Sequence, residues 1–224
     1  MKPIGKGLIS AALGLAAFGL MLFLPAGTFH YWQAWVFLGV FALSTWIPSV
    51  YLMRTNPAAL DRRMRAGPFA ETRTVQRIVI AVIFVCFPAL FVVSALDHRF
   101  GWSPVPTTVC VAGDVLVAVG LGIAMLVVIQ NGYAAANVTV EAGQTLVSTG
   151  LYGLVRHPMY VGNVIMLVGT PLALGSYWAL VFIVPGLIVL VLRIRDEEQL
   201  LTQELHGYRD YTQHVHYRLL PYVW

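Results

Sequence analysis

The sequence has little charge for its length. Only 11% of its 224 residues are Asp, Glu, Lys or Arg, and 58% are hydrophobic, whereas charged residues make up about 25% of a typical soluble domain. The mean hydropathy is +0.76. A soluble protein needs more charged residues than this on its surface. The composition therefore excludes a soluble enzyme and a disordered protein, and it predicts an integral membrane protein.

The chain is also poor in cysteine and in the motifs of common soluble enzymes. Cys86 and Cys110 both lie in apolar runs, so we expect buried thiols rather than a disulfide framework. The sequence contains no Cys/His cluster, HExxH, nucleotide-binding loop or hydrolase elbow, and no metal is expected. The net charge of +4 is too small for a nucleic-acid surface, so no nucleic-acid partner is expected.

Apolar segments divide the chain into about six expected membrane spans. They cover roughly residues 8–24, 31–53, 78–96, 105–129, 159–174 and 177–192. A helical span needs about 20 apolar residues, which the first four segments reach or approach. The last two are shorter and are separated by Gly175-Ser176-Tyr177, which predicts a membrane hairpin. We therefore predict an all-α, polytopic helical membrane protein with a cytoplasmic helix after the hairpin.

The basic residues predict that both termini are cytoplasmic. With the N-terminus inside, thirteen Lys and Arg residues fall on the cytoplasmic side and Arg99 alone falls outside. The first apolar segment lacks an A-x-A cleavage site, so we expect a retained span rather than a signal peptide. Loop 54–77 contains six arginines, which are expected either to keep this loop on the cytoplasmic side or to bind anionic lipid headgroups. A bacterial inner membrane and an endoplasmic reticulum membrane are not distinguished, and the oligomeric state stays open.

Titratable side chains gather at the expected cytoplasmic mouth of the hairpin. The segment 156–160, Arg-His-Pro-Met-Tyr, begins the fifth span, and Arg193 and Glu197-Glu198 follow the sixth. Because a short turn makes these spans antiparallel neighbours, we expect the two groups to lie close together. The alternative is that the arginines are topology anchors and that Glu197 pairs with Arg193 on a solvated helix. Spacing alone leaves both interpretations equally open.

The last two-fifths of the chain resembles the isoprenylcysteine carboxyl methyltransferase family. The resemblance rests on "GQTLVSTGLYGLVRHPMYVGN", two apolar segments, "RIRDEEQLL", "ELHGYRDY" and "YRLLP", in that order, over about residues 130–224. This family and the related phospholipid methyltransferases are integral-membrane enzymes that use S-adenosyl-L-methionine. The resemblance implies a methyltransferase core at 130–224 after N-terminal transmembrane helices at 1–129.

The resemblance also implies the residues of a site. The residues expected to bind the cofactor are Asn137, Gln144, Thr145, Leu146, Val147, Tyr152, His157, Pro158, Met159, Tyr160 and Glu197. Glu197 is expected to bind the amino group of S-adenosyl-L-methionine. Arg193, one helical turn earlier, is expected to face the reacting group and bind the substrate. Arg193 and Glu197 are therefore the expected catalytic residues.

The expected acceptor is a lipophilic small molecule that bears a carboxylate, such as a prenylcysteine-like acid. A carboxylate is ionised at neutral pH, needs no general base, and suits the planar guanidinium of Arg193. An ethanolamine phospholipid N-methyltransferase is an alternative, and it would need a base such as His157 or Glu198. A sterol or polyene reductase that binds NADPH, or a non-catalytic membrane module, is a further alternative.

Two further features of the sequence lie outside this pattern. Asp114 stands near the middle of the fourth expected span, where an acid costs about 2.5–3.5 kcal/mol on insertion scales. It could contact the substrate head or Asn163, but we favour a protonated acid bonded to a neighbouring carbonyl. Residues 137–147 alternate in polarity and predict a short extended segment beside the site.

Overall fold

The computed structural model covers the whole chain and describes residues 3–65, 73–134, 138–141 and 143–224, without the side chains of 3–11 and 64–65. The described residues form helices and loops and include no strand, so the predicted all-α fold is confirmed and the expected extended segment is irregular loop where it is described. The elements are α1 (Pro3–Ala26), α2 (Trp32–Thr55), α3 (Pro57–Arg65), α4 (Thr74–Phe100), α5 (Thr107–Gln130), η1 (Gly150–Gly153), α6 (Pro158–Ala173), η2 (Trp178–Phe182), α7 (Ile183–Glu204) and α8 (Tyr208–His214).

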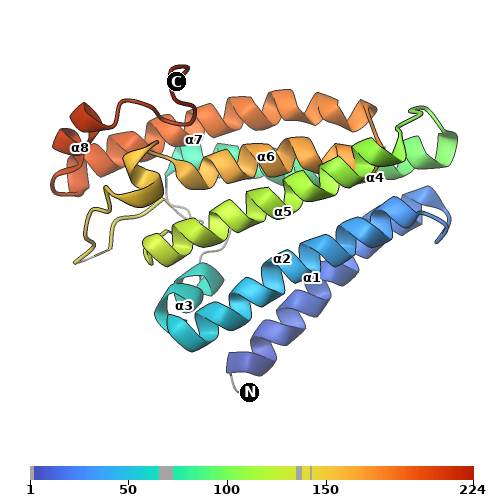
Figure 1. Ribbon diagram of the computed structural model, residues 1–224, viewed down its shortest axis with the longest axis horizontal. Helices are drawn as coiled ribbons and strands as arrows, with labels where there is room; N and C mark the ends of the chain where they lie inside the picture. The colour runs from blue at the N-terminus through green and yellow to red at the C-terminus, as the bar shows by residue number, and fades with distance from the viewer. Residues whose placement is uncertain (1–2, 66–72, 135–137, 142) are drawn as a thin grey trace.

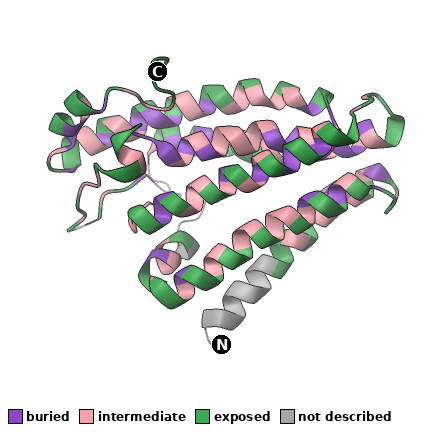
Figure 2. Cartoon of the chain, viewed as in Figure 1, coloured by how far each residue is buried: buried purple, intermediate pink, exposed green. Residues whose placement is uncertain are grey.

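The six apolar helices correspond to the six expected spans. Helices α2, α4 and α5 and the continuous η2–α7 segment are long and apolar enough to cross a membrane, while α1 and α6 contribute shorter apolar stretches. Large hydrophobic side chains such as Leu20, Leu43, Ile47 and Phe84 are exposed on the outer faces of the bundle. Buried residues lie on the faces that the helices turn toward one another (Figure 2). This distribution is that of a polytopic helical membrane protein.

The helices lie side by side in an elongated bundle (Figure 1). Helices α3 and α8, η1 and the described residues between α5 and α6 lie at one end of the bundle, which we call the site end. The short connections 27–31, 101–106 and 174–177 lie at the opposite end, which we call the turn end. Helix α7 continues twelve residues past the apolar segment that ends at Leu192, as the sequence predicted, and brings charged residues to the site end.

Helices α5 and α6 pack against each other so closely that glycine is required at their contact. A Cβ atom on Gly113 would lie 2.2 Å from the backbone nitrogen of Ala173, and one on Gly120 would lie 2.5 Å from the carbonyl oxygen of Gly162. Small residues of this kind allow membrane helices to approach without a hydrophobic driving force. The contact fixes α6 along α5 and therefore fixes where the residues of the first turn of α6 emerge at the site end.

The buried carboxylate of Asp97 joins two of the connections at the turn end by hydrogen bonds. Asp97, which is 1% exposed, accepts hydrogen bonds from the backbone nitrogen (2.7 Å) and hydroxyl (2.6 Å) of Ser103 and from the hydroxyl of Ser176 (2.5 Å). Nearby, the hydroxyl of Tyr31 donates to the carbonyl oxygen of Leu174 at 2.7 Å. These bonds tie the end of α4 to the loop after it and to the turn between α6 and η2.

Asp114 stands apart from this network. Its side chain is buried in α5, and neither carboxylate oxygen has a hydrogen-bond partner among the described residues. The expected hydrogen bond to a neighbouring carbonyl, and a hydrogen bond to Asn163, are therefore both absent from the described part of the chain. Asn163 instead lines an apolar cavity between α4, α6 and α7.

Candidate functional site

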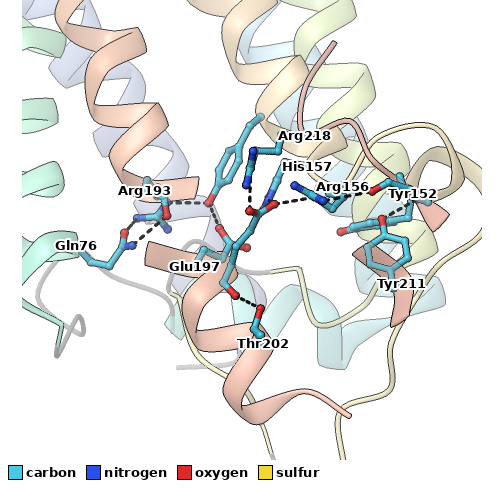
Figure 3. Close-up of polar contacts among 12 residues, drawn as sticks. Gln76, Tyr152, Arg156, His157, Arg193, Glu197, Thr202, Tyr211 and Arg218 are labelled. Atoms are coloured by element: carbon cyan, nitrogen blue, oxygen red, sulfur yellow. Dashed lines mark hydrogen bonds and ion pairs between the residues drawn. The ribbon is translucent and has the colours of Figure 1, made fainter. Parts of the chain in front are cut away.

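The start of α6 and the exit of α7 meet at the site end, as the hairpin geometry predicted. Pro158 opens α6 at a position where its missing N–H costs nothing, and this places Tyr160 in the first turn. The Tyr160 hydroxyl donates to Oε2 of Glu197 at 2.5 Å and accepts from Nε of Arg193 at 2.9 Å (Figure 3). A single phenol therefore links the two side chains expected to be catalytic.

Glu198, next to Glu197 in the sequence, has a different environment. Nε of Arg218 donates to its Oε2 at 2.8 Å, and Nε2 of His157 lies 3.2 Å from its Oε1. Arg156 adds an ion pair, with Nε 2.7 Å from Oε1, although its N–H is not directed at that oxygen. Three basic side chains thus surround Glu198.

The C-terminal tail completes this arrangement through its backbone. The amide nitrogen of Arg156 donates to the carbonyl oxygen of Tyr217 at 2.9 Å, and that of His157 donates to the carbonyl oxygen of Arg218 at 3.0 Å. These bonds run alongside the ion pair between Arg218 and Glu198. Glu198 and the tail therefore hold the segment that precedes α6 in position.

A polar pocket opens between the 131–147 loop and helices α6, α7 and α8. Its lining comprises Asn131, Tyr133, Ala134, Val138, Thr139, Gln144, Thr145, Leu146, Val147, Tyr152, Arg156, His157, Pro158, Met159, Tyr160, Glu197, Leu200, Leu201, Leu205, Tyr208 and Tyr211. Every expected cofactor-binding residue that the structure describes lies in this lining. Asn137 lies outside the described residues. The structure brings these residues together, and their roles in binding stay predictions.

Three of the tyrosines in this lining lie on η1 and α8. The hydroxyl of Tyr211 donates to the carbonyl oxygen of Tyr152 at 2.7 Å, and Nδ2 of Asn131 donates to the Tyr152 hydroxyl at 3.2 Å. The buried hydroxyl of Tyr208 has no partner among the described residues. Burial raises the pKa of Tyr208 above its usual value, so this phenol is neutral and able to donate.

Sequence reasoning gave no role to Asn131, Tyr208 or Tyr211. The signal for the two tyrosines was present in the "ELHGYRDY" segment, where they are three positions apart and so share one helix face. Asn131 had no such signal, because its contact with Tyr152 joins residues on either side of a long loop.

An apolar cavity of about 550 Å³ lies between α4, α6, η2 and α7. Its wall is mostly aliphatic and aromatic and includes Val79, Ile83 and Phe87 of α4, while Arg193 is among its few polar members. Met159 and Tyr160 line both this cavity and the polar pocket. The two spaces therefore share a wall, with Glu197 on the polar side and Arg193 on the apolar side.

Arg193 is held from α4 by a chain of buried polar contacts. Its Nη1 donates to Oε1 of Gln76 at 2.9 Å, and Nε2 of Gln76 donates to Oδ2 of Asp196 at 2.7 Å. Arg73 binds both oxygens of Asp196, with Nε 2.8 Å from Oδ2 and Nη2 2.6 Å from Oδ1. Sequence reasoning missed these residues because more than 115 positions separate the two sides of the contact.

Comparisons with known proteins match part of the chain. A curated relative, the Delta(14)-sterol reductase of Mus musculus, is 34% identical over 85 residues, which are 37% of this chain and 20% of the reductase. The match thus extends over about a fifth of that relative's length. Residues 108–209 match the model of the phospholipid methyltransferase family. From α5 to the start of α8, the chain is therefore similar to a family of membrane methyltransferases related to the one that the sequence motifs resemble.

Proposed function

We propose that this protein is an S-adenosyl-L-methionine-dependent methyltransferase that modifies a lipophilic carboxylate at the membrane interface. The observation that supports this proposal is the common wall of the two cavities at Tyr160. A polar pocket with an acid lies on one side, and an apolar cavity with a guanidinium lies on the other. Such a pair of spaces suits a polar donor and a lipid-like acceptor that meet beside one side chain, where the acceptor oxygen can attack the donor's methyl group and the sulfur departs as a neutral thioether.

The polar pocket fits S-adenosyl-L-methionine by the chemistry of its lining. Glu197 can accept hydrogen bonds from the cofactor's amino group, and the buried Tyr208 hydroxyl, which has no partner among the described residues, can bind another polar group. Leu146, Leu200 and Leu201 offer apolar contacts to a planar base. When bound, the cofactor supplies an electrophilic methyl group on a sulfonium.

The apolar cavity fits the tail of the acceptor, and Arg193 binds its head. A carboxylate is already ionised at neutral pH, so its methylation requires no proton transfer from the protein. The contribution of this chain is then orientation: Arg193 holds the acceptor oxygen, and Tyr160 and Glu197 define the donor side. The cavity lies among apolar helix surfaces, so a lipophilic molecule can reach it from the bilayer.

Methylation of an ethanolamine phospholipid is the second candidate, and the description of the matching family favours it. An ammonium acceptor must first lose a proton to a base. The candidate bases are His157 and Glu198, but they lie 3.2 Å from each other, and Glu198 also faces Arg156 and Arg218. The three basic side chains make Glu198 a weak base, and one ring nitrogen of His157 is engaged with Glu198. A carboxylate acceptor needs no base, so it is favoured.

Purified wild-type protein in lipid nanodiscs tests the proposal in two steps. Calorimetry should detect binding of S-adenosyl-L-methionine, and labelled methyl groups should transfer to N-acetyl-S-farnesylcysteine. Transfer to phosphatidylethanolamine instead would support the second candidate. Binding of NADPH without S-adenosyl-L-methionine would overturn both and point to a reductase, the activity named for the curated relative. Binding of neither cofactor would leave a non-catalytic membrane module.

A further inference from the structure

Helix α3 lies at the site end beside the end of α5 (Figure 1), outside the range that matches the methyltransferase family. Its N-terminus is capped by Asn56, whose Oδ1 accepts a hydrogen bond from the backbone nitrogen of Ala59 at 3.1 Å. Ala59 is 1% exposed and packs in a small core with Leu52 of α2 and Val128 of α5. The cap and this core fix α3 against the last turn of α5, after which the 131–147 loop of the polar pocket begins.

The guanidinium of Arg62, on the next turn of α3, contacts two separate parts of that loop. Its Nη1 donates to the carbonyl oxygen of Gly132 at 3.2 Å, and its Cζ lies 4.4 Å from the centroid of the Tyr133 ring. Its Nε donates to Oε2 of Glu141 at 3.1 Å, so these two side chains form an ion pair. One side chain therefore joins the start of the loop to a residue well beyond it.

The loop residues that Arg62 contacts belong to the polar pocket or are bonded to its lining. Tyr133 is itself part of the lining, and so is Gln144. The backbone nitrogen of Glu141 donates to Oε1 of Gln144 at 3.0 Å, and the backbone nitrogen of Gln144 donates to the carbonyl oxygen of Glu141 at 3.0 Å. Arg62 therefore helps to set where Tyr133 and Gln144 stand in the pocket wall.

The shape of the guanidinium is what allows these contacts to exist together. Its planar fork donates in two directions, to Gly132 and to Glu141, while its face covers the ring of Tyr133. The ammonium group of a lysine is a compact point charge and cannot reproduce this combination. The backbone is also close to α3 here, because a Cβ atom on Gly132 would lie 3.3 Å from Nδ2 of Asn56.

We infer that Arg62 is a positioning residue of the polar pocket, which ties the 131–147 loop to α3 and so holds the pocket in the form that binds the methyl donor. This inference rests on the proposed function for the identity of the donor. A pocket that is competent to bind for only part of the time shows a correspondingly weaker apparent affinity. The donor side of the site thus depends on a helix from the N-terminal half of the chain.

The first test removes the guanidinium and compares the binding of the two substrates. Arg62→Ala in lipid nanodiscs should raise the Kd for S-adenosyl-L-methionine about 5- to 10-fold, the combined effect of losing a hydrogen bond and a cation–π contact. Binding of N-acetyl-S-farnesylcysteine and the melting temperature should change little, because Arg62 lies outside the lining of the apolar cavity. Arg54→Ala removes an exposed arginine at the end of α2 and is the matched control, with an unchanged donor Kd. An unchanged donor Kd in Arg62→Ala, or an equal loss of both affinities, would overturn the inference.

The second test measures the loop itself, in the absence of any ligand. In Arg62→Ala, hydrogen exchange should become faster in the peptides that contain Tyr133 and Gln144, whereas exchange in α5 and α6 should stay as in the wild type. Arg62→Lys keeps a positive charge beside Glu141 but lacks the planar fork, so its loop exchange and its donor Kd should lie between those of the wild type and Arg62→Ala. Equal loop exchange in the wild type and in Arg62→Ala would overturn the inference.

The two measurements keep this inference distinct from the proposed function. If the loop exchanges faster in Arg62→Ala but the wild type does not bind S-adenosyl-L-methionine, the contact between Arg62 and the loop is supported and the proposed donor is refuted. If the loop exchanges faster but the donor Kd is unchanged, Arg62 holds the loop without serving the pocket, and the inference fails.

Discussion

The two ends of the helix bundle use their carboxylates in opposite ways. At the turn end, Asp97 accepts three hydrogen bonds from Ser103 and Ser176, and the bonds join two connections to the end of α4. At the site end, Glu197 faces a pocket and accepts one hydrogen bond from Tyr160, while the Tyr208 hydroxyl beside it has no partner among the described residues. Saturated polar groups stabilise a fold, whereas polar groups left with unused capacity in a pocket are suited to bind a ligand.

Within the site end, Glu197 and Glu198 repeat this contrast. Glu198 is surrounded by Arg156, His157 and Arg218 and holds the tail against the start of α6. Glu197 retains capacity for a ligand although it is the adjacent residue. Because neighbouring positions on a helix point about 100° apart, consecutive residues of one type face different surroundings. The contrast between binding residues and structural residues can be tested by substitution.

The largest expected effect on activity follows from removing the guanidinium of Arg193, which lies beside the wall that the two cavities share. Arg193→Ala should lower methyl transfer by on the order of 1,000-fold, because the acceptor loses the group that orients it. The Kd for S-adenosyl-L-methionine should change by less than about threefold. Labelled methyl transfer and calorimetry measure the two quantities. Arg195→Ala, an exposed arginine on the same helix, is the control and should retain activity. Full activity of Arg193→Ala would remove this residue from the mechanism.

Removing the carboxylate at the turn end should change stability instead of binding. Asp97→Ala leaves two hydroxyls and one backbone N–H without their acceptor, which should cost on the order of 3 kcal/mol of unfolding free energy. Thermal unfolding in detergent measures the loss. At a temperature where the variant is folded, its Kd for S-adenosyl-L-methionine should equal that of the wild type. A specific loss of cofactor affinity would contradict the division between the two ends.

Substitutions of the adjacent residues Glu197 and Glu198 should affect different properties, cofactor affinity for the first and stability for the second. Glu197→Gln should weaken S-adenosyl-L-methionine binding by roughly 10- to 30-fold, because a charge-assisted hydrogen bond to the amino group is lost. Its melting temperature should stay close to that of the wild type. Glu198→Gln is the matched comparison and should lower the melting temperature, because three basic side chains lose their counter-charge. Equal effects of the two substitutions on affinity would refute the distinction.

The smallest expected effect concerns the Tyr208 hydroxyl. Tyr208→Phe removes a buried group that has no partner among the described residues, so stability should be unchanged or slightly higher, while cofactor affinity should fall by about 3- to 10-fold. Since burial raises the pKa of Tyr208 above its usual value, the phenol stays protonated and the affinity difference should be constant between about pH 6 and 9. Tyr211→Phe should instead lower stability, because its hydroxyl binds the carbonyl oxygen of Tyr152.

Much of the fold could be predicted because it depends on local composition. Long uncharged runs must form helices in a bilayer, since only a helix satisfies each backbone group within its own segment. The turn at Gly175 predicted that residues 156–160 and Arg193 would meet, and they do through Tyr160. The resemblance of residues 130–224 to a known family also named the pocket lining closely, because its motifs lie in consecutive segments.

The contacts from outside that range could not be predicted in the same way. Gln76 belongs to α4 and Arg73 immediately precedes it, and no spacing rule connects them with Arg193 and Asp196 more than 115 positions later. The contact of Asp97 with Ser176 is likewise a pairing of distant residues. Asp114 attracted attention as a charge in a span, yet it lines neither cavity.

The sequence by itself therefore determined that the chain is helical and approximately where its membrane helices lie, and its resemblance to a known family named part of the lining of the polar pocket. The helices follow from hydrophobicity and short connections, which act between residues close in the chain. Only the tertiary structure decided which basic side chains surround Glu198 and which side chains direct Arg193. Those outcomes depend on how far α4, α6 and α7 are rotated and shifted against one another, and that is set by close packing such as the glycine contacts between α5 and α6.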